Sequence, residues 1–154
     1  MKTLALVLAW CATAAADARV DWGQGLVLAD GVSVADRHAP SPAVARGTAR
    51  RVAEDLAKKA IAAELPSLPL AGGGKVGDKL NKPQLAEVVA RAFAVAAEPE
   101  TDGGWNVTMA VPIEAVRQAI AGPRALPASG DTGPAVVSVE GAAATPAVGW
   151  KIGG

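Results

Sequence analysis

The chain has few of the side chains on which most enzyme chemistry depends. It contains one histidine, His38, one cysteine, Cys11, and no tyrosine. A catalytic triad needs a histidine beside its nucleophile, and a zinc site needs several histidine, cysteine or carboxylate ligands. His38 stands in a polar loop, where a solvated side chain is the simpler interpretation. We therefore expect no catalytic residue, no metal site and no cofactor, and a protein that is not an enzyme.

Net charge and long hydrophobic runs are also missing. Lysines and arginines number 15, and so do aspartates and glutamates. No net field therefore attracts the chain to nucleic acid or to an anionic membrane. A membrane-spanning helix needs about 20 apolar residues, and the longest apolar run, near the start, is roughly half that length. We expect neither a nucleic-acid partner nor a membrane span.

Aromatic side chains are scarce: there are four tryptophans and one phenylalanine among 154 residues. The hydrophobic share of 51% consists largely of alanine, which buries little area. A core built from small aliphatic side chains needs close approach between backbones. This composition favours helices packed tightly on a small sheet, in one domain large enough for a true core.

The first 18 residues have the layout of a secretory signal peptide. Lys2 supplies a positive start, residues 4–10 are apolar, and residues 12–18 are mostly alanine. Cleavage after Ala18 fits the A-x-A pattern, and cleavage after Ala16 is nearly as good. The sequence therefore predicts export to the periplasm.

Cys11 raises the alternative of an outer-membrane lipoprotein. Leu8 and Ala9 suit a lipobox, but Trp10 occupies the position before the cysteine, where a small residue normally stands. The apolar core would also be short. We therefore favour removal of Cys11 with the leader, and expect contact with a membrane only if Cys11 is lipidated.

The first half of the mature chain predicts a strand and a long helix. Residues 20–34, rich in valine and leucine and punctuated by glycines, predict a strand with a bulge or bend. Ser41 and Pro42 predict the N-cap and the first residue of a helix, and helical periodicity continues from residue 43 to residue 65. Pro66 and Pro69 end this helix, and residues 68–80 predict an exposed connection. The inward stripe of the helix is predicted to comprise Ala45, Ala49, Val52, Ala53, Leu56, Ala60 and Ala63.

The second half predicts two shorter helices around a hairpin. A helix over 84–91 places Leu85, Val88 and Val89 inward, and Asp102-Gly103 predicts a hairpin turn. Alternating apolar residues from 107 to 111 predict the return strand, followed by a helix over 113–121. After a linker, residues 135–139 predict a last strand.

This order predicts an α+β fold: a small, largely antiparallel sheet with helices packed on one face. The predicted organisation is a signal peptide at 1–18, an α+β domain at 19–122, a linker at 123–134, and a C-terminal strand and tail at 135–154.

The pattern resembles a family of exported bacterial proteins. That family is typified by the twenty-kilodalton outer-membrane lipoprotein antigen and by the N-terminal domain of the flagellar assembly protein FlgT. The resemblance rests on GLVLADGVSV, the A-x-x-x-A helix from Ala45 to Ala60, the step NVTMAVPI, and the tail VVSVEGAAATPAVGWKI. It implies a structural or adaptor role in the cell envelope, with protein partners in an outer-membrane or flagellar assembly. It carries no catalytic residues.

Three tryptophans are the candidate binding residues: Trp22, Trp105 and Trp150. We favour the interpretation that they close the ends of an aromatic-poor core, and the functional alternative is an aromatic patch for a partner. A periplasmic small-ligand or glycan-binding module using these tryptophans is the alternative function. A hydrolase using Glu98 or Glu100 as general acid or base is the remaining hypothesis.

Overall fold

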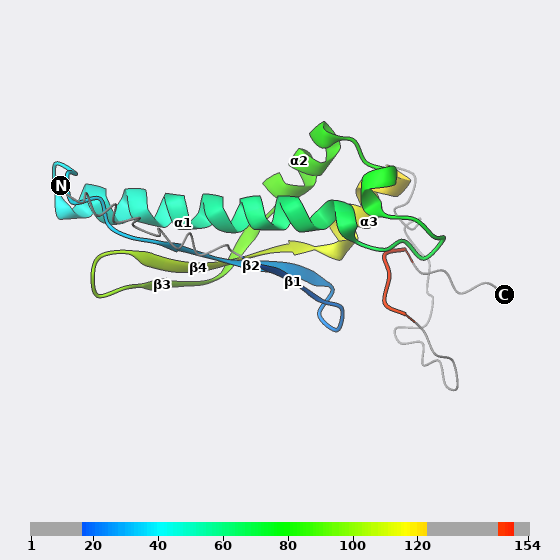
Figure 1. Cartoon of the computed structure of the whole chain (residues 1–154), viewed down its shortest axis with the longest axis horizontal. Helices are drawn as coiled ribbons and strands as arrows, with labels where there is room; N and C mark the ends of the chain where they lie inside the picture. Colours follow the sequence, from blue (N-terminus) through cyan, green and yellow to red (C-terminus); the bar gives the residue numbers. More distant parts are fainter. Residues whose placement is uncertain (1–16, 123–144, 150–154) are drawn as a thin grey trace, which may run out of the picture.

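The computed structural model describes residues 17–122 and 145–149 (Figure 1). A four-stranded antiparallel sheet has the strand order β1-β2-β4-β3. The long helix α1 lies along one face of the sheet, and α2 and α3 lie near its C-terminal end (Figure 1). The predicted α+β fold is confirmed. The elements are β1 (Ala18–Asp21), β2 (Leu26–Ser33), α1 (Pro42–Glu64), short 3-10 helices (Leu65–Ser67 and Val76–Asp78), α2 (Lys82–Ala90), β3 (Phe93–Pro99), β4 (Trp105–Pro112) and α3 (Ile113–Ala121).

Helix α1 begins where the sequence predicts. The Ser41 hydroxyl accepts a hydrogen bond from the Val44 backbone N–H at 3.3 Å, and Pro42 is the first helical residue. Proline costs nothing at this position because its missing N–H would have no partner in the helix. The helix ends at Glu64, one residue before the predicted end.

The buried stripe of α1 differs from the predicted one. Its members recur at every fourth residue, and the larger Val52 and Leu56 are 45% and 37% exposed. Four of the five buried residues are alanines, and these small side chains allow the backbones of α1 and the sheet to approach closely. The buried residues of α1 are Ala45, Ala49, Ala53, Ala57 and Ile61.

Gly31 in β2 shows how close this approach is. A Cβ atom at Gly31 would lie 1.9 Å from the Ala53 carbonyl oxygen, far inside any van der Waals contact. Nearby, the buried Ser33 hydroxyl donates to the Ala49 carbonyl oxygen at 2.7 Å. Strand β2 therefore contacts the α1 backbone directly, through the missing side chain of Gly31 and the hydrogen bond from Ser33.

The N-terminal segment is a hairpin, so the prediction of one bent strand over 20–34 is wrong. Strands β1 and β2 pair antiparallel, with Asp21 opposite Leu26. Gly25 in the turn between them has φ of 67°, a conformation that favours glycine. Gly23 and Gly25 therefore belong to a reversal of the chain, whereas Gly31 lies within β2.

The hairpin and helix of the second half are confirmed. Strands β3 and β4 pair antiparallel, and Gly103 in their turn has φ of 85°. Val107, Met109 and Val111 are buried against the core, as the alternation predicts. Helix α3 has the predicted bounds, Ile113–Ala121.

The connection after α1 is more buried than predicted. Leu68, Val76 and Leu80 are at most 4% exposed and belong to the core. Val148 is also buried, and it forms a parallel bridge with Leu70. The predicted linker at 123–134 and the predicted strand at 135–139 lie outside the described residues.

Candidate protein-binding surfaces

The two edge strands of the sheet differ in length and in chemistry. β1 is four residues long and carries Arg19 and Asp21. β3 is seven residues long, and its first five residues, Phe93 to Ala97, are uncharged. Short, charged edge strands resist pairing with another chain, whereas long apolar edges invite it. Among residues 17–122 and 145–149, β3 is therefore the edge strand that is better suited to pairing with a partner strand.

Large apolar side chains of β3 are exposed. Phe93 is 47% exposed and Val95 is 53% exposed. The β3–β4 register shifts between Ala94 and Ala96, so Val95 has no partner residue on β4. Such an irregularity is a bulge, which alters the direction of the strand locally and re-aims side chains.

The sheet face opposite α1, which we call the open face, carries no helix in the described part of the chain (Figure 1). Residues that pair directly across antiparallel strands share a face. One such row crosses all four strands, from Arg19 through the buried Leu28 and Ala110 to the exposed Phe93. Phe93 therefore belongs to the open face. Val32, four residues after Leu28 in β2 and 52% exposed, lies on the same face.

Asp30 is the charged residue near the middle of the open face. Its carboxylate accepts a hydrogen bond from the Thr108 hydroxyl at 2.5 Å and pairs with Arg19 at 2.6 Å. The hydrogen bond from Thr108, with a smaller contribution from Arg19, lowers the pKa of Asp30 below its ordinary value. Asp30 is therefore held as an anion whose charge is already paired, which suits a contact surface better than a proton-transfer group.

The candidate tryptophans do not form one patch. Trp22 lies beside the β1–β2 turn and Trp105 opens β4, so they lie at opposite ends of the sheet. The eight residues of β2 separate these ends by about 23 Å. Both tryptophans are partly buried against the core. Trp150 lies outside the described residues.

Trp105 closes the core beneath α1. The Arg50 guanidinium lies 5.3 Å from the centre of the Trp105 ring, within the range of a cation–π interaction. Arg50 also forms an ion pair with Glu54 at 3.0 Å. The Trp105 indole N–H is buried and has no hydrogen-bond partner in the described part of the chain. This geometry favours the core-closing interpretation for Trp105.

The structure does not assemble the remaining candidates into a reactive site. Glu98 lies on exposed β3 opposite Asn106, Glu100 lies at the hairpin turn, and His38 lies in the loop before α1. Among residues 17–122 and 145–149, no group of three histidine, cysteine or carboxylate side chains could hold a metal ion.

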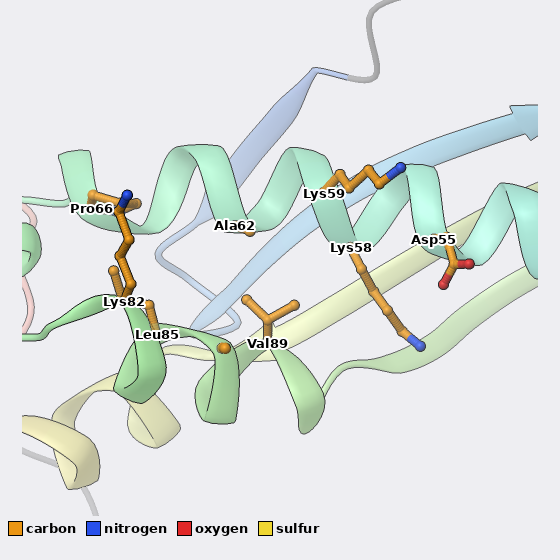
Figure 2. Close-up of a pocket in the computed structure, with 9 residues that line it drawn as sticks. Asp55, Lys58, Lys59, Ala62, Pro66, Lys82, Leu85 and Val89 are labelled. Carbon is orange, nitrogen blue, oxygen red and sulfur yellow. The ribbon is translucent and has the colours of Figure 1, made fainter.

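A groove between α1 and α2 is the second surface with a distinct chemistry (Figure 2). It has a volume of about 510 Å³. Its floor is apolar and lysines stand at its margins, a pattern that periodicity alone does not reveal because the two helices come from separate segments. The lining residues are Asp55, Lys58, Lys59, Ala62, Pro66, Lys82, Leu85, Ala86 and Val89.

Comparison of the chain with models of known families, with curated proteins and with solved structures gives no match. Among the described residues, no helix has the length and hydrophobicity that crossing a membrane requires.

Proposed function

We propose that the protein is an exported cell-envelope adaptor that binds another protein through β3 and the adjoining open face. The exposure of Phe93 and Val95 on β3, an edge strand of the sheet that the described residues form, carries this proposal. An uncovered apolar edge is a hazard for a protein that acts alone, and natural sheets usually protect such edges. β1 has that protection through its short length and its charges, whereas the first five residues of β3 carry no charge and have only the bulge at Val95, which leaves Phe93 and Val95 exposed.

The mode of binding that fits this surface is strand addition. A partner strand would pair with the free backbone groups of β3, and its side chains would contact Phe93 and Val95. The backbone pairing would supply affinity and the apolar side chains would supply specificity. Asp30 and Arg19, already paired with each other, would lie beside the contact as part of a polar rim.

Export to the periplasm is the second part of the proposal. Ala18 pairs with Ala29 in the β1–β2 ladder. Cleavage after Ala16 would keep β1 whole, whereas cleavage after Ala18 would remove one of its paired residues. The leader pattern alone favours cleavage after Ala18. The β1 register supports cleavage after Ala16 instead. The partner is then an envelope protein, with an outer-membrane or flagellar assembly as the candidate setting.

The mass of the mature protein from fractionated host cells tests export. A periplasmic protein that begins at Asp17 or Arg19 is the expected result. A chain that keeps its leader and stays in the cytoplasm would refute export. A lipid-modified Cys11 in the outer-membrane fraction would replace the soluble form with the lipoprotein alternative.

Pull-down from envelope extracts, with identification of the captured proteins by mass, tests the binding surface. We expect Phe93→Glu and Val95→Glu to lose a partner that the unaltered protein retains. Val44→Glu is the matched control, because Val44 is 48% exposed and lies on α1, away from β3. Equal losses in all three variants, or retention of the same partners by the two β3 variants, would contradict the proposal.

A further inference from the structure

The groove between α1 and α2 is formed by one face of each helix. The residues that α1 contributes follow helical spacing: Asp55, Lys58 and Ala62, with Pro66 just beyond the helix. The α2 positions from Lys82 through Leu85 to Val89 do the same. Residues three and four apart lie on one face of a helix. The groove is therefore a continuous channel between two helix faces.

Its floor and its ends differ in chemistry. Ala62, Leu85 and Val89 lie between the helices, and Leu85 and Val89 are half-buried, with their remaining surface open to solvent (Figure 2). Lys82 lies at the Pro66 end and Lys58 at the opposite end, beside Asp55 (Figure 2). None of the ion pairs among the described residues involves a lysine. The groove thus offers an apolar centre between two cationic ends.

The separation between Lys58 and Lys82 limits the kind of ligand that the groove can bind. Along α1, Lys58 and Pro66 are eight residues apart, which corresponds to about 12 Å. A fatty acid has one anionic head and would engage one end, and small ligands are normally enclosed over most of their surface. An amphipathic helix in an open groove presents apolar anchors and flanking charges together.

We propose that the α1–α2 groove binds an acidic amphipathic helix of a partner protein. Two acidic residues seven positions apart, with two apolar residues between them at the third and fourth positions, match the order of charge and apolar surface in the groove. Seven residues of helix span about 10.5 Å, close to the rise of about 12 Å between Lys58 and Pro66, beside which Lys82 lies (Figure 2). This site is separate from β3, so it stands or falls independently of the proposed function.

Asp55 allows the predicted negative charge of the occupant to be tested. Its carboxylate lines the end occupied by Lys58 and opposes an incoming acidic residue. Asp55→Asn removes this repulsion and strengthens binding, whereas Lys58→Glu and Lys82→Glu weaken it. Arg46→Glu is the control, because Arg46 is exposed on α1 about 120° around the helix from Lys58.

The experiment uses the purified protein, as processed by the cell, and a synthetic capped peptide. The peptide has about 16 residues, long enough for measurable helicity, with glutamates at i and i+7 and leucines at i+3 and i+4. Calorimetric titration is expected to show binding that weakens roughly tenfold in the Lys58→Glu, Lys82→Glu double variant. Asp55→Asn should bind more tightly than the unaltered protein, and Arg46→Glu should bind equally.

A charge-swapped peptide, with lysines in place of both glutamates, separates loss of the site from loss of the fold. It should bind the double variant better than it binds the unaltered protein. Absence of binding by the glutamate peptide, equal binding to all variants, or failure of the charge swap in a folded double variant would overturn the proposal. Binding of laurate or of phosphatidylglycerol vesicles that depends on the same lysines, without binding of the peptide, would also overturn the proposal. If the double variant fails to fold, Asp55→Asn decides, because unchanged or weaker peptide binding overturns the proposal.

Discussion

Replacement of Gly31 by alanine tests the closest contact of the fold. The added Cβ would lie 1.9 Å from the Ala53 carbonyl oxygen and 2.9 Å from the Ala57 backbone nitrogen. Ordinary contacts of a Cβ atom begin near 3.4 Å, so α1 would have to withdraw from β2 by about 1.5 Å, in a region packed to the density of a protein interior. The clash is with backbone, which has no alternative rotamer, and the withdrawal would loosen the packing of Ala49, Ala53 and Ala57.

The expected loss of stability is at the upper end of the range for overpacking, about 3 kcal/mol. Urea unfolding followed by circular dichroism measures it. Gly47→Ala is the matched control: Gly47 lies in α1, and no atom lies within 4 Å of its added Cβ. Alanine should stabilise that helix position by about 0.5–1 kcal/mol. A Gly31→Ala protein within about 0.5 kcal/mol of the unaltered protein would refute the close approach of α1 to β2.

Three smaller perturbations test other contacts, each by urea unfolding. Ser33→Ala removes the buried hydrogen bond to the Ala49 carbonyl and should cost about 1 kcal/mol; an unchanged unfolding midpoint would count against that bond. Ser41→Ala removes the side-chain cap of α1 and should cost about 1 kcal/mol, whereas Ser41→Gly should cost only a few tenths. Asp30→Asn addresses pH: the pKa of Asp30 is lowered in the folded state, chiefly by the Thr108 hydrogen bond. Its ionised form therefore contributes stability above the unfolded pKa, and this contribution is lost as the pH falls through the folded pKa. Asp30→Asn should be slightly less stable than the unaltered protein at pH 7, and this difference in the free energy of unfolding should disappear below about pH 4. A difference that stays constant across this range would contradict a lowered pKa of Asp30.

Local signals in the sequence were sufficient for several elements. The serine and proline before α1 predict its start because a cap needs only residues adjacent in the chain. The alternation of Val107, Met109 and Val111 predicts β4 and its buried face for the same reason.

Features that depend on contacts distant in sequence were mispredicted. Val52 and Leu56 belong to the apolar face of α1 by periodicity, but the sheet opposite approaches so closely that methyl groups are favoured there. The connection after α1 has the composition of an exposed turn, yet Leu68 and Val76 complete the core beneath it. Only the folded chain specifies the space that such residues fill.

The candidate surfaces likewise depend on contacts between segments that are distant in sequence. The favoured interpretation, that tryptophans close the ends of the core, agrees with Trp22 and Trp105, which pack against the core at opposite ends of β2. The free edge of β3 depends on strand order, and the α1–α2 groove depends on how two helices meet. Neither property is encoded in a short segment of sequence.

Site-specific photo-cross-linking in intact host cells tests the central claim most directly. A benzoylphenylalanine at Val95, on the free edge of β3, is compared with one at Val44, which is similarly exposed on α1. The adaptor proposal predicts a discrete cross-linked product with an envelope protein from position 95 and none from position 44. Absence of a product from position 95, or the same product from both positions, would contradict it.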